Sequence, residues 1–127
     1  MVYGIGTDIC EVRRFEKWLK KPDLFLRFFN ENEQFSGDFC QNEGAACRHY
    51  AARFAAKEAF SKALGTGFRD GIFLKDIQIL HDALGKPELH VSGGALTALN
   101  KLAATPRLHI SLSDDYPYAQ AVVIIEK

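Results

Sequence analysis

The segment between residues 45 and 64 constrains the fold more than any other part of the chain. It contains neither proline nor glycine and is rich in alanine, the strongest helix former among the amino acids. Gly65 follows directly and suits a helix stop, because glycine readily adopts the left-handed conformation that ends many helices. The sequence therefore predicts one long helix over residues 45–64.

Short apolar or alternating segments on both sides of this helix predict strands. Residues 2–7 form an apolar run interrupted by glycines, and Ile77 and Ile79 alternate with polar residues. The predicted strands cover 2–7, 74–81, 87–91, 107–113 and 118–126, with turns at 83–86 and 114–117. One early strand, a helical middle and later strands that can pair antiparallel predict an α+β fold, in which an antiparallel sheet packs against the long helix and shorter helices.

The shorter helices are predicted from apolar spacing and from capping residues. Val12, Phe15 and Trp18 recur at a spacing typical of a helix. The predicted helices cover about 11–19, 24–29, a third short helix capped by Asn30, and 93–103. Residues 36–44 predict a loop, and Asp70 and Asp76 are expected in turns or at strand edges.

Composition limits the class of protein. A chain of 127 residues fits one domain over 1–127, and a hydrophobic fraction of 47% supports a core without disulfides. The formal net charge of zero argues against nucleic-acid binding. No run reaches the ~18 apolar residues that cross a bilayer, and the start lacks a secretory signal, so we expect a cytoplasmic protein with no membrane partner. The three cysteines are odd in number and form no C-x-x-C, which argues against a disulfide framework or a zinc site.

Charged residues are unevenly distributed over the first third of the chain. Residues 1–27 carry six basic and four acidic side chains, whereas residues 30–43 carry four acids and no base. Such a distribution either steers a charged partner or forms two solvated faces.

The long helix places a carboxylate among cations. Glu58 and Lys62 lie four residues apart on a stripe with alanines, and Arg53 and Lys57 form a neighbouring basic row. This arrangement suits an anionic ligand held partly through a metal ion. The alternative is a surface ion pair between Glu58 and Lys62, contributing roughly 0.2–0.5 kcal/mol.

Two further segments offer polar groups to a ligand. Asp8 comes directly after the first predicted strand, where it either binds a ligand at the sheet edge or caps the following helix. In the segment 108–113, His109, Ser111 and Ser113 alternate with apolar residues and share one face of a strand. That face either lines a phosphate or ribose site or is exposed to solvent. His49, His81 and His90 have no visible metal-ligand partners and are interpreted as structural or surface residues.

Together these segments resemble the holo-acyl-carrier-protein synthase family, the small single-domain 4'-phosphopantetheinyl transferases. The run from Gly4 to Ile9 is similar to the amino-terminal signature of the family, and the run from Arg53 to Gly67 is similar to its most specific signature. Gly85-Lys86-Pro87 and the run from His109 to Ser113 match further family segments in the expected order. Residues 34–48 match no family pattern, and Asp114 and Asp115 stand where many relatives carry a histidine.

The resemblance implies an activity, a cofactor and a fold. It implies transfer of the 4'-phosphopantetheine group from coenzyme A to a serine of apo-acyl carrier protein, with magnesium, by a protein with the 4'-phosphopantetheinyl transferase fold. It also implies a homotrimer with active sites shared between neighbouring subunits. Either Glu58 or a water held by the metal would take the serine proton.

The resemblance also implies roles for individual residues. Asp8 and Glu58 would hold the magnesium ion, and Lys62 would contact the pyrophosphate beside Glu58 in the catalytic centre. The residues expected to bind the nucleotide part of coenzyme A are Arg53, Lys62, Lys86, His109 and Ser111. The residues expected to face the acidic carrier protein are Arg14, Lys17 and Lys21.

Two other functions are compatible with the same residues. One is a non-catalytic module that binds coenzyme A or a carrier protein, for which loss of Asp8 or Glu58 would be diagnostic; both are present. The other is a structural subunit of a synthase complex, which would bind the carrier protein without magnesium-dependent turnover.

Overall fold

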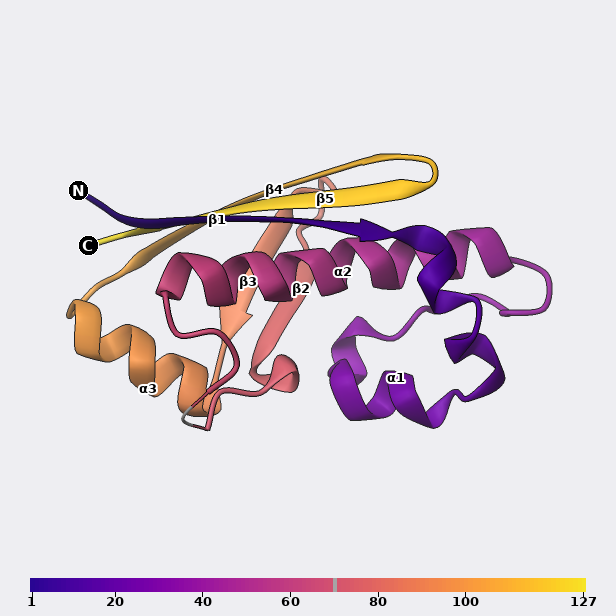
Figure 1. Cartoon of the computed structure of the whole chain (residues 1–127), viewed down its shortest axis with the longest axis horizontal. Coiled ribbons are helices and arrows are strands. Elements are labelled where there is room, and N and C mark those ends of the chain that lie inside the picture. The colour runs from indigo at the N-terminus through magenta and orange to yellow at the C-terminus, as the bar shows by residue number, and fades with distance from the viewer. Residues whose placement is uncertain (70) are drawn as a thin grey trace.

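The computed structural model describes residues 1–69 and 71–127 and has an α+β fold. A three-stranded antiparallel sheet has the order β1–β5–β4, built from β1 (Val2–Glu11), β4 (Arg107–Asp115) and β5 (Tyr118–Glu126). A separate antiparallel hairpin consists of β2 (Ile77–His81) and β3 (Pro87–Val91). Helix α2 (Glu43–Leu64) lies along one face of the three-stranded sheet, and α1 (Asp23–Phe28) and α3 (Gly93–Leu102) lie beyond it (Figure 1). The predicted α+β fold is confirmed, whereas the expectation for Asp70 lies outside the described residues.

Helix α2 confirms the strongest sequence prediction. It begins at Glu43, inside the segment expected to be a loop, and it ends at Leu64 as predicted. Gly65 adopts a φ of 87°, and its N–H donates to the carbonyls of Ser61 and Lys62. Among the described residues, no helix combines the length and the apolar character needed to cross a membrane.

Glycines let β1 lie unusually close to α2. A Cβ atom on Gly6 would lie 1.8 Å from the carbonyl oxygen of Ala59, and one on Gly4 would lie 2.0 Å from that of Ala63. Since no side chain fits in these gaps, the strand backbone packs directly on the helix backbone. This contact fixes which residues of α2 lie opposite the inward-facing residues of β1.

Strand β1 is longer than predicted, which changes the position of Asp8. The strand continues to Glu11, so Asp8 lies within it rather than beyond it and caps no helix. Asp8 shares the alternation of Gly6 and Cys10, both buried, and therefore faces α2.

The predicted helix over 11–19 is wrong. Two 3-10 turns, Val12–Phe15 and Trp18–Lys20, occupy this segment instead. Val12, Phe15 and Trp18 are three residues apart, a spacing that matches the three residues per turn of a 3-10 helix and brings all three onto the core. The first of these turns is also tied to the end of the sheet, because the Val12 N–H donates to the Pro117 carbonyl.

The other predicted elements are largely confirmed. The helix expected over 24–29 corresponds to α1, and Asn30 caps a 3-10 turn over Glu31–Glu33, as predicted. The strand expected over 74–81 begins only at Ile77, because residues Leu74–Asp76 form a 3-10 turn. In that turn the Asp76 carboxylate accepts the Phe73 N–H, in agreement with the turn position expected for Asp76.

Candidate active site

Asp8, Glu58 and Lys62 lie together at the contact between β1 and α2. Glu58 and Lys62 are one helical turn apart on α2. The Lys62 Nζ donates to the Asp8 Oδ1 at 3.0 Å and to the Thr7 carbonyl at 3.0 Å. The close packing of Gly6 on α2 thus brings a strand carboxylate to a helix carboxylate and a helix ammonium group.

The two carboxylates are close enough to affect each other electrostatically. Burial raises the pKa of Glu58 above its usual value, and the negative charge of Asp8 raises it further. The positive charges of Lys62 and Arg14 act in the opposite direction. A partly buried carboxylate beside a second carboxylate is destabilised in its charged form, and an additional cation would stabilise both.

This pair of carboxylates fits a magnesium ion. The Asp8 side chain is 19% exposed and Glu58 is partly exposed, so both can be reached from solvent. In the part of the chain that the structure describes, no group of three or more histidine, cysteine, aspartate or glutamate side chains could enclose a metal. Magnesium needs only one or two carboxylates when phosphates and waters complete its octahedral shell. A metal-bound anionic substrate is therefore the ligand that this donor set suits.

Arg14 lies beside the same site. Its guanidinium stacks over the Phe54 ring at 4.6 Å, and its charge acts on both Glu58 and Cys10. Arg14, Lys17 and Lys21 are exposed and lie on or next to the two 3-10 turns, not on the helix that was predicted for them. Of these three residues, Arg14 is the one whose charge acts on Glu58.

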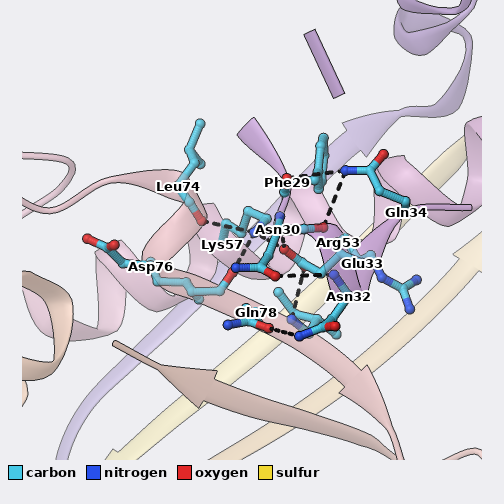
Figure 2. A network of polar contacts seen from close by, with 12 residues as sticks. Phe29, Asn30, Asn32, Glu33, Gln34, Arg53, Lys57, Leu74, Asp76 and Gln78 are labelled. Atoms are coloured by element: carbon cyan, nitrogen blue, oxygen red, sulfur yellow. Dashed lines mark hydrogen bonds and ion pairs between the residues drawn. The ribbon is translucent and has the colours of Figure 1, made fainter. Parts of the chain in front are cut away.

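The predicted basic row beside Glu58 is wrong, because Lys57 is buried in the core. Its side chain is 0% exposed and its Nζ lies 2.7 Å from Oε1 of Glu33, which is equally buried. Lys57 also donates to the carbonyls of Leu74 and Ile77 (Figure 2). Glu33 is thus not part of a solvated acidic face, and Lys57 is not available to a ligand.

Arg53 lies on the same side of α2 as Lys57, away from Glu58. Only 9% of Arg53 is exposed, and its guanidinium donates to His49 and His81. The structure therefore separates Arg53 from the group formed by Asp8, Glu58 and Lys62.

Lys86, His109 and Ser111 form a second group of predicted ligand residues. Lys86 and His109 line one groove between the turn of the β2–β3 hairpin and strand β4. In the register of the sheet, Thr7, Val122 and Ser111 are neighbours, and so are Asp8, Ala121 and Leu112. Because side chains alternate, Ser111 and His109 point to the outer face of the sheet, whereas Asp8 points to the helix.

The outer face of the sheet also carries exposed apolar side chains. Ile5 and Ile9 on β1 are each 64% exposed, and Val122 and Ile124 on β5 are only partly buried. Exposed apolar side chains at adjacent positions indicate an interaction surface. Asp8 and the pair His109 and Ser111 therefore lie on opposite faces of the sheet in one copy of the chain. The exposed apolar residues make the outer face suited to contact with another protein.

Sequence reasoning missed the polar network around α2. Glu33 follows Asn30 at the spacing of a capping box, and both halves of that box are present. The sequence contained this local signal, but it did not show that the Glu33 carboxylate also accepts the N–H of Ile79 and the ammonium of Lys57. His49 and His81, interpreted as structural or surface residues, both contact Arg53.

The chain is similar to proteins of one known family over nearly its whole length. A family model described as the 4'-phosphopantetheinyl transferase superfamily matches residues 4–121. A holo-[acyl-carrier-protein] synthase of Geobacter sp. (strain M21) is 45% identical over 129 residues, covering 100% of both chains. The crystal structure of holo-[acyl-carrier-protein] synthase from Neisseria meningitidis has a TM-score of 0.83 at 40% identity, covering 100% of both chains. A holo-(acyl-carrier-protein) synthase from Bacillus anthracis, solved in complex with CoA (3',5'-ADP), has a TM-score of 0.76 at 35% identity, covering 98% of this chain and 96% of that one.

Proposed function

Since the chain belongs to the 4'-phosphopantetheinyl transferase superfamily, we propose that it transfers the 4'-phosphopantetheine group of coenzyme A to a serine of apo-acyl carrier protein. The products are holo-acyl carrier protein and adenosine 3',5'-bisphosphate. The observation that carries this proposal is the meeting of Asp8, Glu58 and Lys62 at the β1–α2 contact. The holo-carrier protein that the reaction produces serves fatty acid synthesis. The protein acts in the cytoplasm.

The chemistry follows from the charges at this site. The serine oxygen bonds to the β-phosphorus, and the bond from that phosphorus to the oxygen of adenosine 3',5'-bisphosphate breaks. Glu58 accepts the serine proton, and burial raises its pKa above the usual value of a glutamate. Lys62 neutralises a phosphate oxygen as a compact point charge. Magnesium, held by Asp8 and Glu58, would supply further stabilisation of the charge on the phosphate oxygens.

The site is completed by a second copy of the chain, in a homotrimer. The supporting observation is that Asp8 and His109 point to opposite faces of one sheet, so one copy does not present both to a single ligand. The exposed Ile5 and Ile9 provide apolar surface for the contact between copies. Lys86, His109, Ser111 and Arg53 of one subunit then bind the nucleotide, while the carboxylates of its neighbour act on the phosphates.

Mixing two inactive variants tests the shared site. Glu58→Gln and His109→Ala each remove one half of the site, so each homotrimer is expected to have little activity. Co-expressed chains are expected to regain about one quarter of the sites, because random assembly pairs two intact halves at that frequency. The measurement is transfer activity of the purified mixed trimer. A mixture no more active than its components, or an active monomer in sedimentation, contradicts the proposal.

Arg14, Lys17 and Lys21 receive the acidic carrier protein. We expect Arg14→Glu to raise the KM for carrier protein roughly tenfold or more, because a like charge replaces a complementary one at the rim of the site. The KM for coenzyme A is expected to stay nearly constant. Steady-state kinetics measure both values, with Lys101→Glu, at an exposed position on α3, as the matched charge reversal. Equal increases in both KM values would refute this assignment.

One assay tests the proposed function as a whole. Apo-acyl carrier protein, coenzyme A and magnesium are mixed with the purified protein, and mass spectrometry follows addition of the phosphopantetheine group. The expected result is complete conversion with magnesium and none with an excess of chelator. A carrier protein that binds but stays unmodified would support a non-catalytic module instead.

A further inference from the structure

Arg53 is a buried arginine whose hydrogen-bond partners are two histidines instead of an acid. Its Nη1 lies 3.2 Å from Nδ1 of His49, and its Nη2 lies 3.2 Å from Nδ1 of His81. The Nε atom is buried, and within the described residues it has no hydrogen-bond partner. Buried guanidinium groups are usually paired with carboxylates. Within the described residues Arg53 forms no ion pair; the charge of the buried Glu33 acts on it, but Glu33 is itself paired with Lys57, so the Arg53 guanidinium can still bind another anion.

The contacts determine the protonation state of the histidine that lies deeper. Arginine has donors and no acceptor, so the Nδ1 atom of His49 must carry a lone pair. Its Nε2 atom faces the Glu33 carbonyl, which only accepts, so Nε2 carries the proton. Burial, followed by the charge of Arg53, lowers the pKa of His49 to about 4. His49 is therefore neutral at physiological pH and anchors one arm of the guanidinium.

His81 holds the other arm and connects it to the hairpin turn. His81 is the last residue of β2, and the next residue, Asp82, begins the turn to β3. The Asp82 carboxylate accepts the Lys86 N–H at 2.9 Å, and the Asp82 N–H donates to the Lys86 carbonyl at 2.9 Å. Asp82, Lys86 and His109 line the same groove. The bond between Arg53 and His81 thus ties α2 to the turn that carries Lys86.

We propose that His81 is a positioning residue, which accepts a hydrogen bond from Arg53 and thereby orients that guanidinium to bind, together with Lys86, a phosphate of the donor nucleotide. This inference rests on the proposed function, in which Arg53 and Lys86 bind the nucleotide part of coenzyme A. His81 itself is exposed and touches the ligand only through Arg53. For this role, the side chain at position 81 must carry a hydrogen-bond acceptor at its δ position.

Two substitutions separate an acceptor role from packing. His81→Leu removes the acceptor, whereas the Oδ1 of His81→Asn places one near the position of Nδ1. We expect His81→Leu to raise both the KM for coenzyme A and the Kd for adenosine 3',5'-bisphosphate by roughly three- to tenfold, the value of one hydrogen bond. The kcat and the KM for carrier protein are expected to change less than twofold. His81→Asn is expected to restore wild-type values.

Steady-state kinetics give the KM for coenzyme A, and titration calorimetry gives the Kd for adenosine 3',5'-bisphosphate. Thermal unfolding verifies that both variants fold. An unchanged KM and Kd in His81→Leu overturns the inference while an active wild type leaves the proposed function intact. A loss in His81→Asn equal to that in His81→Leu also overturns it, because packing then explains the effect. A wild type that binds no adenosine 3',5'-bisphosphate and transfers nothing overturns the proposed function itself.

Discussion

Glu58→Gln is expected to lower turnover by about 10²–10⁴-fold, the range that general acid–base catalysis contributes. The amide cannot accept the serine proton, and it is a weaker ligand for a divalent cation than a carboxylate is. Asp8 and Lys62 remain in place, so binding of coenzyme A is expected to weaken less than turnover does. Initial rates by mass spectrometry at saturating magnesium give the comparison.

The same substitution is not expected to damage the fold. Burial and the neighbouring Asp8 raise the pKa of Glu58, so the folded protein holds this proton more tightly than the unfolded chain does. The stability that this proton contributes is present below the unfolded pKa and is lost as pH rises through the folded pKa. At neutral pH the charge on Glu58 therefore costs stability, and the neutral amide is expected to leave the melting temperature equal or higher.

A second glutamate on the same helix is the matched control. Glu43 lies in the first, exposed turn of α2, far along the helix from Lys62, and Glu43→Gln is expected to keep full turnover. Near-normal turnover of Glu58→Gln in saturating magnesium would mean that the residue is misassigned. A large fall in the melting temperature would mean that Glu58 mainly holds the structure together.

Asp8 was expected just beyond the first strand, and only the family resemblance joined it to Glu58; the alternation along the longer β1 explains their meeting. Alternation along β1 places Gly4, Gly6 and Asp8 on one face, and only that face can approach the alanines of α2. The spacing of Glu58 and Lys62 then requires both to lie on one side of the helix. The alternation along the strand, the spacing along the helix and the two glycines Gly4 and Gly6 therefore account for the position of Asp8 relative to Glu58 and Lys62.

The burial of Lys57 and Arg53 was not predictable in the same way. Alanine occurs on every side of α2, so no apolar stripe distinguishes the buried face from the exposed one. The burial of Lys57 depends on its pairing with Glu33, a residue 24 positions away in the sequence, and nothing in the local sequence pattern indicates this contact. The turns after β1 were missed for a related reason, since three-residue spacing fits both an α-helix and a 3-10 helix.

The buried pair of Glu33 and Lys57 predicts the largest effect on stability. Glu33 accepts the Lys57 ammonium, the Ile79 N–H and the Asn30 N–H, so it joins α2, β2 and the turn after α1 (Figure 2). Burial lowers the pKa of Lys57, and the charge of Glu33 counteracts that effect. Glu33→Ala leaves an ammonium group in the core without its partner. We expect a loss of about 3–5 kcal/mol in the free energy of unfolding, a large share of the total for a domain of this size.

A double-mutant cycle distinguishes the ion pair from simple loss of packing. Lys57→Met alone leaves the Glu33 carboxylate buried without its cation and is expected to destabilise the protein about as much as Glu33→Ala does. Combined with Glu33→Gln, it removes both charges and retains a side chain that can still accept one backbone N–H. The double variant is therefore expected to lose less stability than the sum of the losses in the single variants Glu33→Gln and Lys57→Met. Urea unfolding followed by circular dichroism measures the free energy of unfolding of the wild type, both single variants and the double variant.

The exposed pair of Glu11 and Arg13 provides the control for this cycle. The two charged groups lie a similar distance apart, 2.9 Å, but the Glu11 side chain is 49% exposed and the Arg13 side chain is 57% exposed. Water already solvates these charges, so Glu11→Ala is expected to change the stability little. If Glu33→Ala were equally harmless, Lys57 would have to be neutral or solvated in the folded protein. If the losses of the single variants were simply additive, the two charges would act independently and the pair would not join these three segments.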